Sequence, residues 1–330
     1  MLLPILVFLS MAGRDARPMI AFTARIYYPP GDRRIAHHQV DVSQLDGSHR
    51  KRLSSDRFDC DGVRWIGDHK LAWIEYQPGH EDDIGFRGDD SKPLRLVLFD
   101  LVTERRGTVA TGRITGYSRH IGWCGSATGR RGDGLYSIGS DVQRLTAGGS
   151  FPYKETDDPE ADQNDDAVTW KWRGLPTVKY VGPEGPNLVT NLSGGGTEEG
   201  PAPVFERNGR RHTFLVGGDV VHVTPSHRDP DITWCLTGSY AGSAGSHEWI
   251  YRMDWKTDKA KCVVDDLLDI DFQPDNRYYA GITTNKVTRP LGKKMVWARD
   301  VVAGDLQTGK RWIVLGGLVH ATSVSIQPGG

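Results

Sequence analysis

The chain has 330 residues, and its 41 Lys and Arg residues are balanced by 42 Asp and Glu residues. This balance excludes a protein that binds nucleic acid through a broad basic surface, because such a surface needs an excess of Lys and Arg to neutralise phosphates. A hydrophobic content of 38% with ten Trp residues excludes wholesale disorder. The 40 Gly and 18 Pro residues indicate many short strands joined by tight turns.

The chain begins with an apolar run over residues 2–11, which is too short to cross a membrane because a spanning helix takes ~18 apolar residues. Ser10 and Ala12, one residue apart, give the small-x-small pattern of a signal-peptidase site. We therefore expect a leader over residues 1–17, a single domain over residues 18–330, and a secreted or periplasmic protein that does not span a membrane. No Lys or Arg precedes the run, so a misassigned start or an apolar first strand stays open as an alternative.

The first repeated unit along the chain is a hairpin over residues 41–54. Apolar and polar residues alternate on both sides of Asp46–Gly47, and the glycine supplies the positive φ that a tight hairpin turn requires. A second unit, a strand followed by a short polar turn and another apolar strand, appears at 63–74 and 270–282. Weaker copies of the first unit lie at 96–104, 249–258 and 305–315.

The two units alternate, and their first strands start near residues 63, 120, 168, 221, 269 and 324. A spacing of roughly 50 residues per four strands is typical of β-propeller blades. The segment 324–327 has the pattern of a first strand without a second, and Met19–Thr23 that of a second strand without a first. Pairing of these segments would complete a blade and remove exposed sheet edges. The sequence therefore predicts an all-β, six-bladed propeller of four-stranded antiparallel blades, closed by a blade shared between the N- and C-termini.

Two segments carry a resemblance to a known family. Gln273–Ala280, with the sequence QPDNRYYA, and Leu45–Ser54, with the sequence LDGSHRKRLS, resemble the WD40-like repeat of TolB-type propellers. The resemblance covers nearly the whole chain as architecture. It implies a six-bladed propeller that is usually exported and serves as a scaffold for partners, and it implies no catalytic mechanism.

Two residue types bear on the packing of such a fold. Four Trp residues lie in alternating apolar strands, and we expect them to pack between neighbouring blades: Trp65, Trp73, Trp123 and Trp234. The four Cys residues have no CxxC spacing, which leaves two disulfides or buried thiols as alternatives: Cys60, Cys124, Cys235 and Cys262.

The expected ligand site lies on the face that carries the loops between second and third strands. These loops are long in several units, at 26–37, 76–93, 239–248 and 284–295, and repeated extension on one face indicates a recognition surface. We predict that the chain, as a monomer, binds a protein or glycan ligand there, close to the mouth of the channel. The predicted binding residues are His37, His38, His80, Tyr240, His247, Glu248 and His320.

Histidines and carboxylates in these loops could also hold a divalent metal, as in oligogalacturonate lyases, which are propellers with a His-rich metal site. No spacing between them defines a ligand set. The prediction is therefore that the chain has no cofactor, with a divalent metal as the alternative. A metal-dependent enzyme similar to the oligouronide lyases is accordingly one alternative to the scaffold.

A second alternative is a glycosidase. Glu198–Pro201 followed by Val204–Gly209 resembles the acid-bearing strand of family 43-like glycosidases, in which a Glu before a small residue and Pro protonates the leaving sugar. Glu199 would be that acid. The Asp motif that these enzymes place on their first strand is missing, as are the G-x-S-x-G, H-E-x-x-H and P-loop motifs. A binding scaffold is therefore the leading function and a carbohydrate-active enzyme the alternative.

Overall fold

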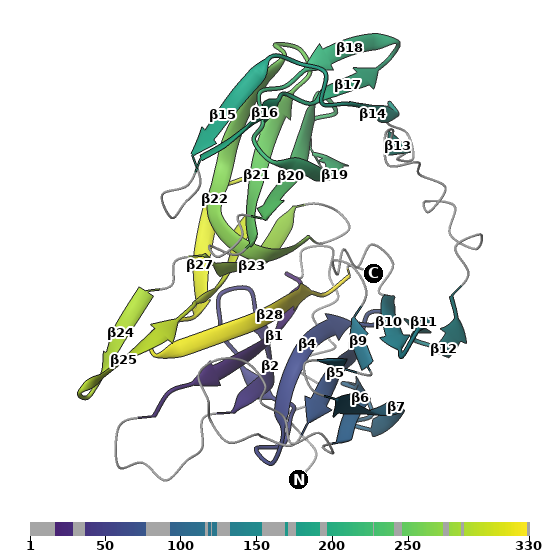
Figure 1. Cartoon of the computed structure of the whole chain (residues 1–330), viewed down its shortest axis with the longest axis vertical. Coiled ribbons are helices and arrows are strands. Elements are labelled where there is room, and N and C mark those ends of the chain that lie inside the picture. The colour runs from purple at the N-terminus through teal and green to yellow at the C-terminus, as the bar shows by residue number, and fades with distance from the viewer. Residues whose placement is uncertain are drawn as a thin grey trace.

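The computed structural model describes residues 17–28, 37–76, 93–115, 118–119, 121–123, 133–153, 169–170, 176–191, 197–226, 228–240, 246–272, 277–284 and 287–328. Within these residues the chain forms 28 β-strands and no α-helix, which confirms the all-β prediction (Figure 1). Neighbouring strands of each sheet pair antiparallel. No helix that is long and apolar enough to cross a membrane occurs in this part of the chain.

One four-stranded sheet joins the two ends of the chain. Its strand order is β28-β1-β2-β3, and β28 lies beside β1 in Figure 1. Ile20 lies opposite Ile326 and Phe22 opposite Val324, which confirms the predicted pairing of the first and last strands. The strands span Met19–Ile26 (β1), His38–Gln44 (β2), Lys51–Arg52 (β3) and Val319–Ile326 (β28).

Two further sheets follow in chain order. The first has the order β4-β5-β6-β7-β8, and the second has the order β12-β11-β10-β9. The strands of the first span Asp59–Trp65 (β4), Lys70–Tyr76 (β5), Pro93–Asp100 (β6), Arg106–Thr115 (β7) and Ser118–Arg119 (β8). Those of the second span Ile121–Trp123 (β9), Gly134–Ile138 (β10), Asp141–Thr146 (β11) and Gly149–Pro152 (β12).

The next sheet has the order β13-β14-β17-β18, with the two-stranded hairpin β15-β16 inserted between β14 and β17. Its strands span Thr169–Trp170 (β13), Val178–Gly182 (β14), Val204–Arg207 (β17) and Arg210–Thr213 (β18). The hairpin strands span Asn187–Asn191 (β15) and Thr197–Pro201 (β16).

A seven-stranded sheet, β19-β20-β21-β22-β23-β26-β27, contains two four-stranded units that share β22. The first part of β22 pairs with β21, and from Leu267 onward the strand pairs with β23. The strands span Asp219–Pro225 (β19), Ile232–Tyr240 (β20), Ser246–Asp254 (β21), Lys259–Phe272 (β22), Tyr278–Thr283 (β23), Val301–Asp305 (β26) and Lys310–Leu315 (β27). A separate hairpin between β23 and β26 consists of Val287–Leu291 (β24) and Lys294–Ala298 (β25).

The predicted first strands coincide with strands of the structure. β4, β9, β13, β19 and β28 each begin close to their predicted starts, and the predicted start at 269 falls in the part of β22 that pairs with β23. The period read from the sequence therefore corresponds to real four-stranded units.

The predicted turn at Asp46–Gly47 is formed between β2 and β3. The Ser48 N–H donates to Asp46 Oδ1 at 3.0 Å, and Gly47 has a φ of 80°. A Cβ on Gly47 would lie 2.5 Å from the carbonyl oxygen of Val314 in β27. Glycine is thus required twice here, because the turn needs a positive φ and the strand of another sheet approaches it closely.

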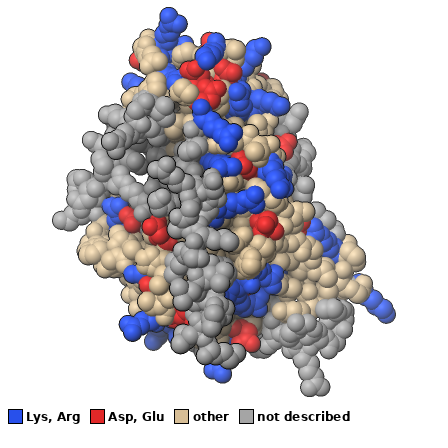
Figure 2. Space-filling view, turned by 180° about the vertical axis from the view of Figure 1, so that it is seen from behind, with Lys and Arg blue, Asp and Glu red and all other residues tan. Residues whose placement is uncertain are grey.

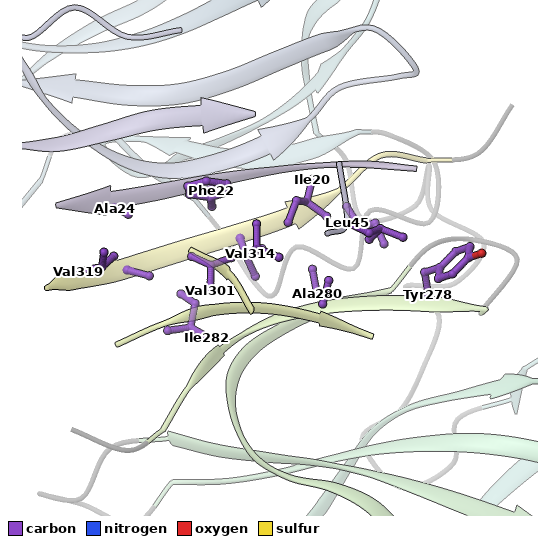
Figure 3. Close-up of a cluster of buried hydrophobic side chains, with 14 residues drawn as sticks. Ile20, Phe22, Ala24, Leu45, Tyr278, Ala280, Ile282, Val301, Val314 and Val319 are labelled. Atoms are coloured by element: carbon purple, nitrogen blue, oxygen red, sulfur yellow. The ribbon is translucent and has the colours of Figure 1, made fainter. Parts of the chain in front are cut away.

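The sheets pack face to face through apolar side chains. Figure 3 shows Ile20 and Phe22 of β1 in the same cluster as Ala280 of β23 and Val301 of β26. Three of the four predicted Trp residues are buried between sheets and Trp123 is half-buried, so the strand registers are confirmed: Trp65 and Trp73 pack with β1 and β2, and Trp234 packs with β22, β23 and β26. On the face seen in Figure 2, basic and acidic side chains are interspersed.

One segment predicted to be a loop contains strands instead, and a second has strand residues at both of its ends while residues 241–245 lie outside the described part of the chain. Residues 284–295 contain β24 and the start of β25, because Gly292, with a φ of 62°, allows a tight hairpin turn there. Residues 239–248 contain the end of β20 and the start of β21, so His247 and Glu248 are strand residues. The Cys residues fit the buried-thiol alternative where the structure describes them: Cys60 and Cys235 are buried thiols and Cys262 is a partly buried thiol, while Cys124 lies outside the described residues.

Candidate functional site

A row of three polar side chains crosses the sheet that joins the chain ends. Arg25 of β1 lies opposite His320 of β28 on one side and opposite His38 of β2 on the other. Residues directly opposite each other in antiparallel strands project from the same face of the sheet. The strand register therefore brings together two of the predicted histidines, which are 282 positions apart in the sequence.

Asp59, the first residue of β4, extends this row. The N–H of His38 donates to Asp59 Oδ1 at 2.7 Å, and Nδ1 of the His38 ring lies 3.1 Å from the same oxygen. Nε2 of His38 lies 3.2 Å from Nδ1 of His320. Burial would raise the pKa of Asp59, but the hydrogen bonds and charge of His38, with the charge of Arg25, lower it. Asp59 is therefore an ionised acceptor that orients His38.

The protons of the two rings follow from that acceptor. Since the Asp59 carboxylate can only accept, His38 donates from Nδ1. A neutral His38 then accepts at Nε2 from the Nδ1–H of His320, whereas a protonated His38 donates to His320. In the first case Nε2 of His320 is an acceptor, and in the second it is a donor.

Two arginines give this cluster a positive balance. Burial and, after it, the charges of His38, Arg299 and Arg25 together lower the pKa of His320 to about 4. The backbone of Arg299 is bonded to β28 on both sides of His320, through its N–H to Val319 and its carbonyl to Ala321. A neutral His320 thus lies near two guanidinium groups and one carboxylate.

Arg25 has the Asp59 carboxylate nearby, but Arg299 has no carboxylate among the described residues that offsets its charge. Nε of Arg25 is buried without a hydrogen-bond partner, and burial alone lowers the pKa of Arg299. A buried cation without a counter-charge is unfavourable, and a bound anion would relieve it. The cluster of Arg25, His38, Asp59, Arg299 and His320, called here the histidine–arginine cluster, therefore has the chemistry of a site for an anionic group.

A second group of titratable residues lies on β21 and β22. Burial raises the pKa of Glu248 to about 7 and that of Asp271 to about 7, and nearby carboxylates add to both shifts. Part of Asp269 is exposed to solvent, but protein is packed around its carboxyl group. This burial of the carboxyl group raises its pKa to about 6. With a φ of 47°, Asp269 lies at the irregularity where the pairing of β22 with β23 shifts register. These three carboxyl groups are thus partly protonated near neutral pH.

Two of these carboxylates join neighbouring sheets. Asp269 Oδ2 accepts the N–H of Val324 at 2.9 Å, and Asp271 Oδ2 accepts the N–H of Ile326 at 2.8 Å. The hydroxyl of Ser325 donates to Asp271 Oδ2 at 3.0 Å, and the hydroxyl oxygen Oγ of Ser325 accepts the N–H of Trp65 at 3.2 Å. Asp269 and Asp271 therefore have a structural role, because they satisfy backbone donors of β28 that no sheet ladder reaches.

The other predicted site residues are dispersed. His247 is 3% exposed and stacks on Trp249 in a cluster with Phe214 and Met253, so it lies on a different packing surface from the His38–His320 pair. Glu248 accepts the N–H of Ile270 at 2.6 Å. The remaining residues are placed as follows: His37 directly before β2, Tyr240 at the end of β20, Glu199 exposed on the hairpin strand β16, and His80 outside the described residues.

Sequence reasoning did not find Arg25, Asp59 or Arg299. The predicted pairing of Met19–Thr23 with the last strand, continued to the end of β1, would have placed Arg25 opposite His320. Asp59 and Arg299 carried no such signal, because they reach the cluster from other sheets. The described His, Cys, Asp and Glu residues form no group of three or more that could hold a metal ion.

No family model matches the chain, and no curated protein matches it in sequence. Among solved structures, TolB from Acinetobacter baumannii is similar with a TM-score of 0.44 and 15% identity, over 94% of this chain and 67% of that one. A TolB protein from Agrobacterium tumefaciens is similar with a TM-score of 0.37 and 12% identity, over 94% and 98%. Oligogalacturonate lyase from Vibrio parahaemolyticus is similar with a TM-score of 0.32 and 11% identity, over 74% and 69%. TolB proteins are thus among the solved structures that resemble this chain, as the sequence predicted.

Proposed function

We propose that the chain is an exported, six-bladed β-propeller scaffold that binds an anionic group of a protein or glycan ligand at the histidine–arginine cluster. Four-stranded units that recur at the predicted period support the blade count, and the pairing of β1 with β28 supports a ring closed by the two ends of the chain. The leader predicted over residues 1–17 supports export.

One observation carries the binding function. Arg25 and Arg299 converge on His320 with one carboxylate, Asp59, to balance them. Guanidinium groups form charge-assisted hydrogen bonds with carboxylates, and a partly buried setting strengthens them. His320 Nε2 would add a directional contact, while the Asp59–His38 pair fixes the orientation of the His320 ring.

The test is calorimetric titration with two matched pairs of probes. The first pair is oligogalacturonate and its methyl ester, and the second is a peptide with a free C-terminal carboxylate and the same peptide amidated. The proposal expects the carboxylate member of one pair to bind more tightly, and the responding pair identifies the ligand as glycan or protein. Arg299→Gln should weaken that binding by roughly tenfold or more, because a charge-assisted hydrogen bond is lost.

The control variant is Arg228→Gln, which removes an exposed guanidinium outside the cluster. It should bind as the wild type does. Equal binding of both members in each pair, or unchanged binding by Arg299→Gln, would contradict the proposed site.

A carbohydrate-active enzyme is the second candidate, and Glu248 favours it. Its pKa of about 7 keeps part of the carboxyl population protonated near neutrality, which is the property a general acid needs. Glu199 does not provide comparable support, because it is exposed on an outer hairpin. Release of reducing ends from polygalacturonate or xylan by the wild type, lost in Glu248→Gln, would support the enzyme. If the wild type releases no reducing ends, the enzyme is contradicted and the binding scaffold is the function that remains.

A further inference from the structure

The hairpin β24-β25 is separate from the larger sheets. Its two strands pair only with each other, and the hairpin projects from the molecule at the lower left of Figure 1. A two-residue turn, Gly292–Lys293, joins the strands at the tip. Two-stranded hairpins are marginally stable on their own, so this one depends on the side that faces the protein.

The strand register separates the hairpin into two faces. Ala298 is buried, and Arg289 on the same face is paired with Asp300, with Nη–Oδ distances of 2.9 Å. On the opposite face, Pro290 of β24 lies directly across from Met295 of β25, and Trp297 lies two residues further along β25. One face is therefore anchored to the protein and the other is directed away from it.

The outward face is apolar and exposed. Met295 is 58% exposed, Trp297 is 53% exposed, and Pro290 is exposed beside them. Single exposed apolar residues are common, but three in register on a projecting hairpin form a contiguous surface. Such a surface on an extension of the fold indicates contact with another body.

The charge of the segment that contains the hairpin indicates what its exposed face contacts. Between Thr284 and Asp300 the sequence contains five basic residues and no acidic residue, although the whole chain has a net charge of −1: Lys286, Arg289, Lys293, Lys294 and Arg299. Arg289 is neutralised by Asp300 and Arg299 belongs to the histidine–arginine cluster, whereas Lys293 is exposed at the turn. In Figure 2 the hairpin forms the projection at the lower right, and basic atoms lie at its end. The apolar face is thus combined with an unbalanced positive charge.

We propose that this hairpin docks the protein on a bilayer surface that carries anionic headgroups, with Met295 and Trp297 entering the headgroup region. Trp favours the membrane–water interface, and Lys residues next to it are attracted to anionic lipids. A stable protein interface buries roughly 800 Å² on each partner and needs a complementary shape. Three side chains on a narrow projection suit a bilayer better, because a fluid surface adapts to them.

The experiment is sedimentation of the whole protein with vesicles. Vesicles of phosphatidylcholine with phosphatidylglycerol are compared with vesicles of phosphatidylcholine alone, each at low and high salt. The proposal expects binding to the anionic vesicles at low salt, reduced binding at high salt and little binding to the neutral vesicles. Trp297→Ala and the double variant Lys293→Glu/Lys294→Glu should each lower the binding constant, the latter by more than about tenfold.

Ile313→Ala provides a matched control, since Ile313 on β27 is 67% exposed and lies outside the hairpin. It should bind vesicles as the wild type does. Circular dichroism and the unfolding midpoint verify that each variant is folded, which is expected because the substituted side chains are outside the core.

Three results would overturn the proposal: no sedimentation with anionic vesicles at low salt, equal sedimentation with neutral vesicles, or hairpin variants that bind as the wild type does. A different pair of results would assign the surface to an acidic protein partner and would show that the bilayer assignment is wrong. In that case the wild type does not bind vesicles but is retained on a polyglutamate resin, and the hairpin variants lose that retention.

Discussion

Replacing Asp271 with Asn should make the protein more stable at alkaline pH. Asp271 is 2% exposed, its Oδ2 accepts hydrogen bonds from Ile326 and Ser325, and its Oδ1 is buried with no partner found in the described part of the chain. Burial raises its pKa from 3.8 to about 7. The folded state therefore favours the protonated carboxyl group, and an amide has nearly the same shape without the charge.

The sign and size follow from proton linkage. A group whose folded pKa is raised contributes stability below its unfolded pKa and loses it as the pH rises through the folded pKa. A shift from 3.8 to about 7 corresponds to roughly 4 kcal/mol over the whole range, of which roughly 2.5 kcal/mol falls between about pH 5 and pH 8. Glu248 and Asp269 act in the same direction, so the wild type should lose stability as the pH rises to about 8.

The assay is urea unfolding of the wild type and Asp271→Asn at about pH 5 and pH 8. The quantity to compare is the change in the stability difference between the two pH values, because any constant effect of the amide cancels. His320 has a lowered pKa, so the stability that it contributes to the protein is lost as the pH falls through about 4. This contribution is the same in both proteins and therefore also cancels. From about pH 5 to pH 8, the free energy of unfolding of Asp271→Asn should rise by roughly 2.5 kcal/mol relative to that of the wild type.

Asp305→Asn is the control, since Asp305 is also buried but lies beside Arg277. Removing that charge should destabilise the protein at pH 8 rather than stabilise it. A stability difference for Asp271→Asn that is equal at both pH values would refute the reasoning, because it would show that Asp271 ionises as readily in the folded state as in the unfolded state.

Three further predictions concern packing and export. Trp65→Ala should lower the free energy of unfolding by roughly 3–5 kcal/mol in urea titration, since it empties a buried site and removes the hydrogen bond from its indole to Ser325. Gly62→Ala should lower it by roughly 1–3 kcal/mol, because φ is 62° and a Cβ would lie 2.4 Å from the Trp123 ring; a stability equal to wild type would contradict this contact. N-terminal sequencing of protein secreted by cells that express the full chain should begin after Ala12, where the cleavage pattern lies inside the predicted leader segment 1–17, and an intact Met1 would contradict the leader.

Much of the fold could be predicted because its signals are local. Alternating apolar residues predicted the strands, and Asp46–Gly47 predicted a turn. The recurrence of both patterns predicted the spacing of the four-stranded units along the chain. The pairing of the two chain ends also followed, since the incomplete strand patterns of 324–327 and Met19–Thr23 complement each other. The prediction of a loop at 284–295 was wrong, because the segment forms a hairpin. Its many charged residues are typical of a loop, and the two-residue turn at Gly292 was not recognised among them.

The candidate site was predicted less well, because its geometry depends on contacts between sheets. His38 was predicted from a long loop and His320 from its place just before the last first strand, and the structure brings their ring nitrogens to 3.2 Å. His247 was placed with them on the same argument, but it lies on β21 in a different sheet and packs on Trp249. Arg299 and Asp59 could not be assigned without knowing how neighbouring sheets stack.

The proposed binding of an anionic group at the histidine–arginine cluster is tested most directly by NMR titration of the His320 imidazole, with and without the carboxylate probe that binds. In the free protein the ring should stay neutral down to about pH 4. A carboxylate bound between Arg25 and Arg299 would add a negative charge beside the ring, so the pKa of His320 should rise by about one unit or more when the probe is present. Binding of the probe with an unchanged pKa of His320 would contradict the assignment of the site.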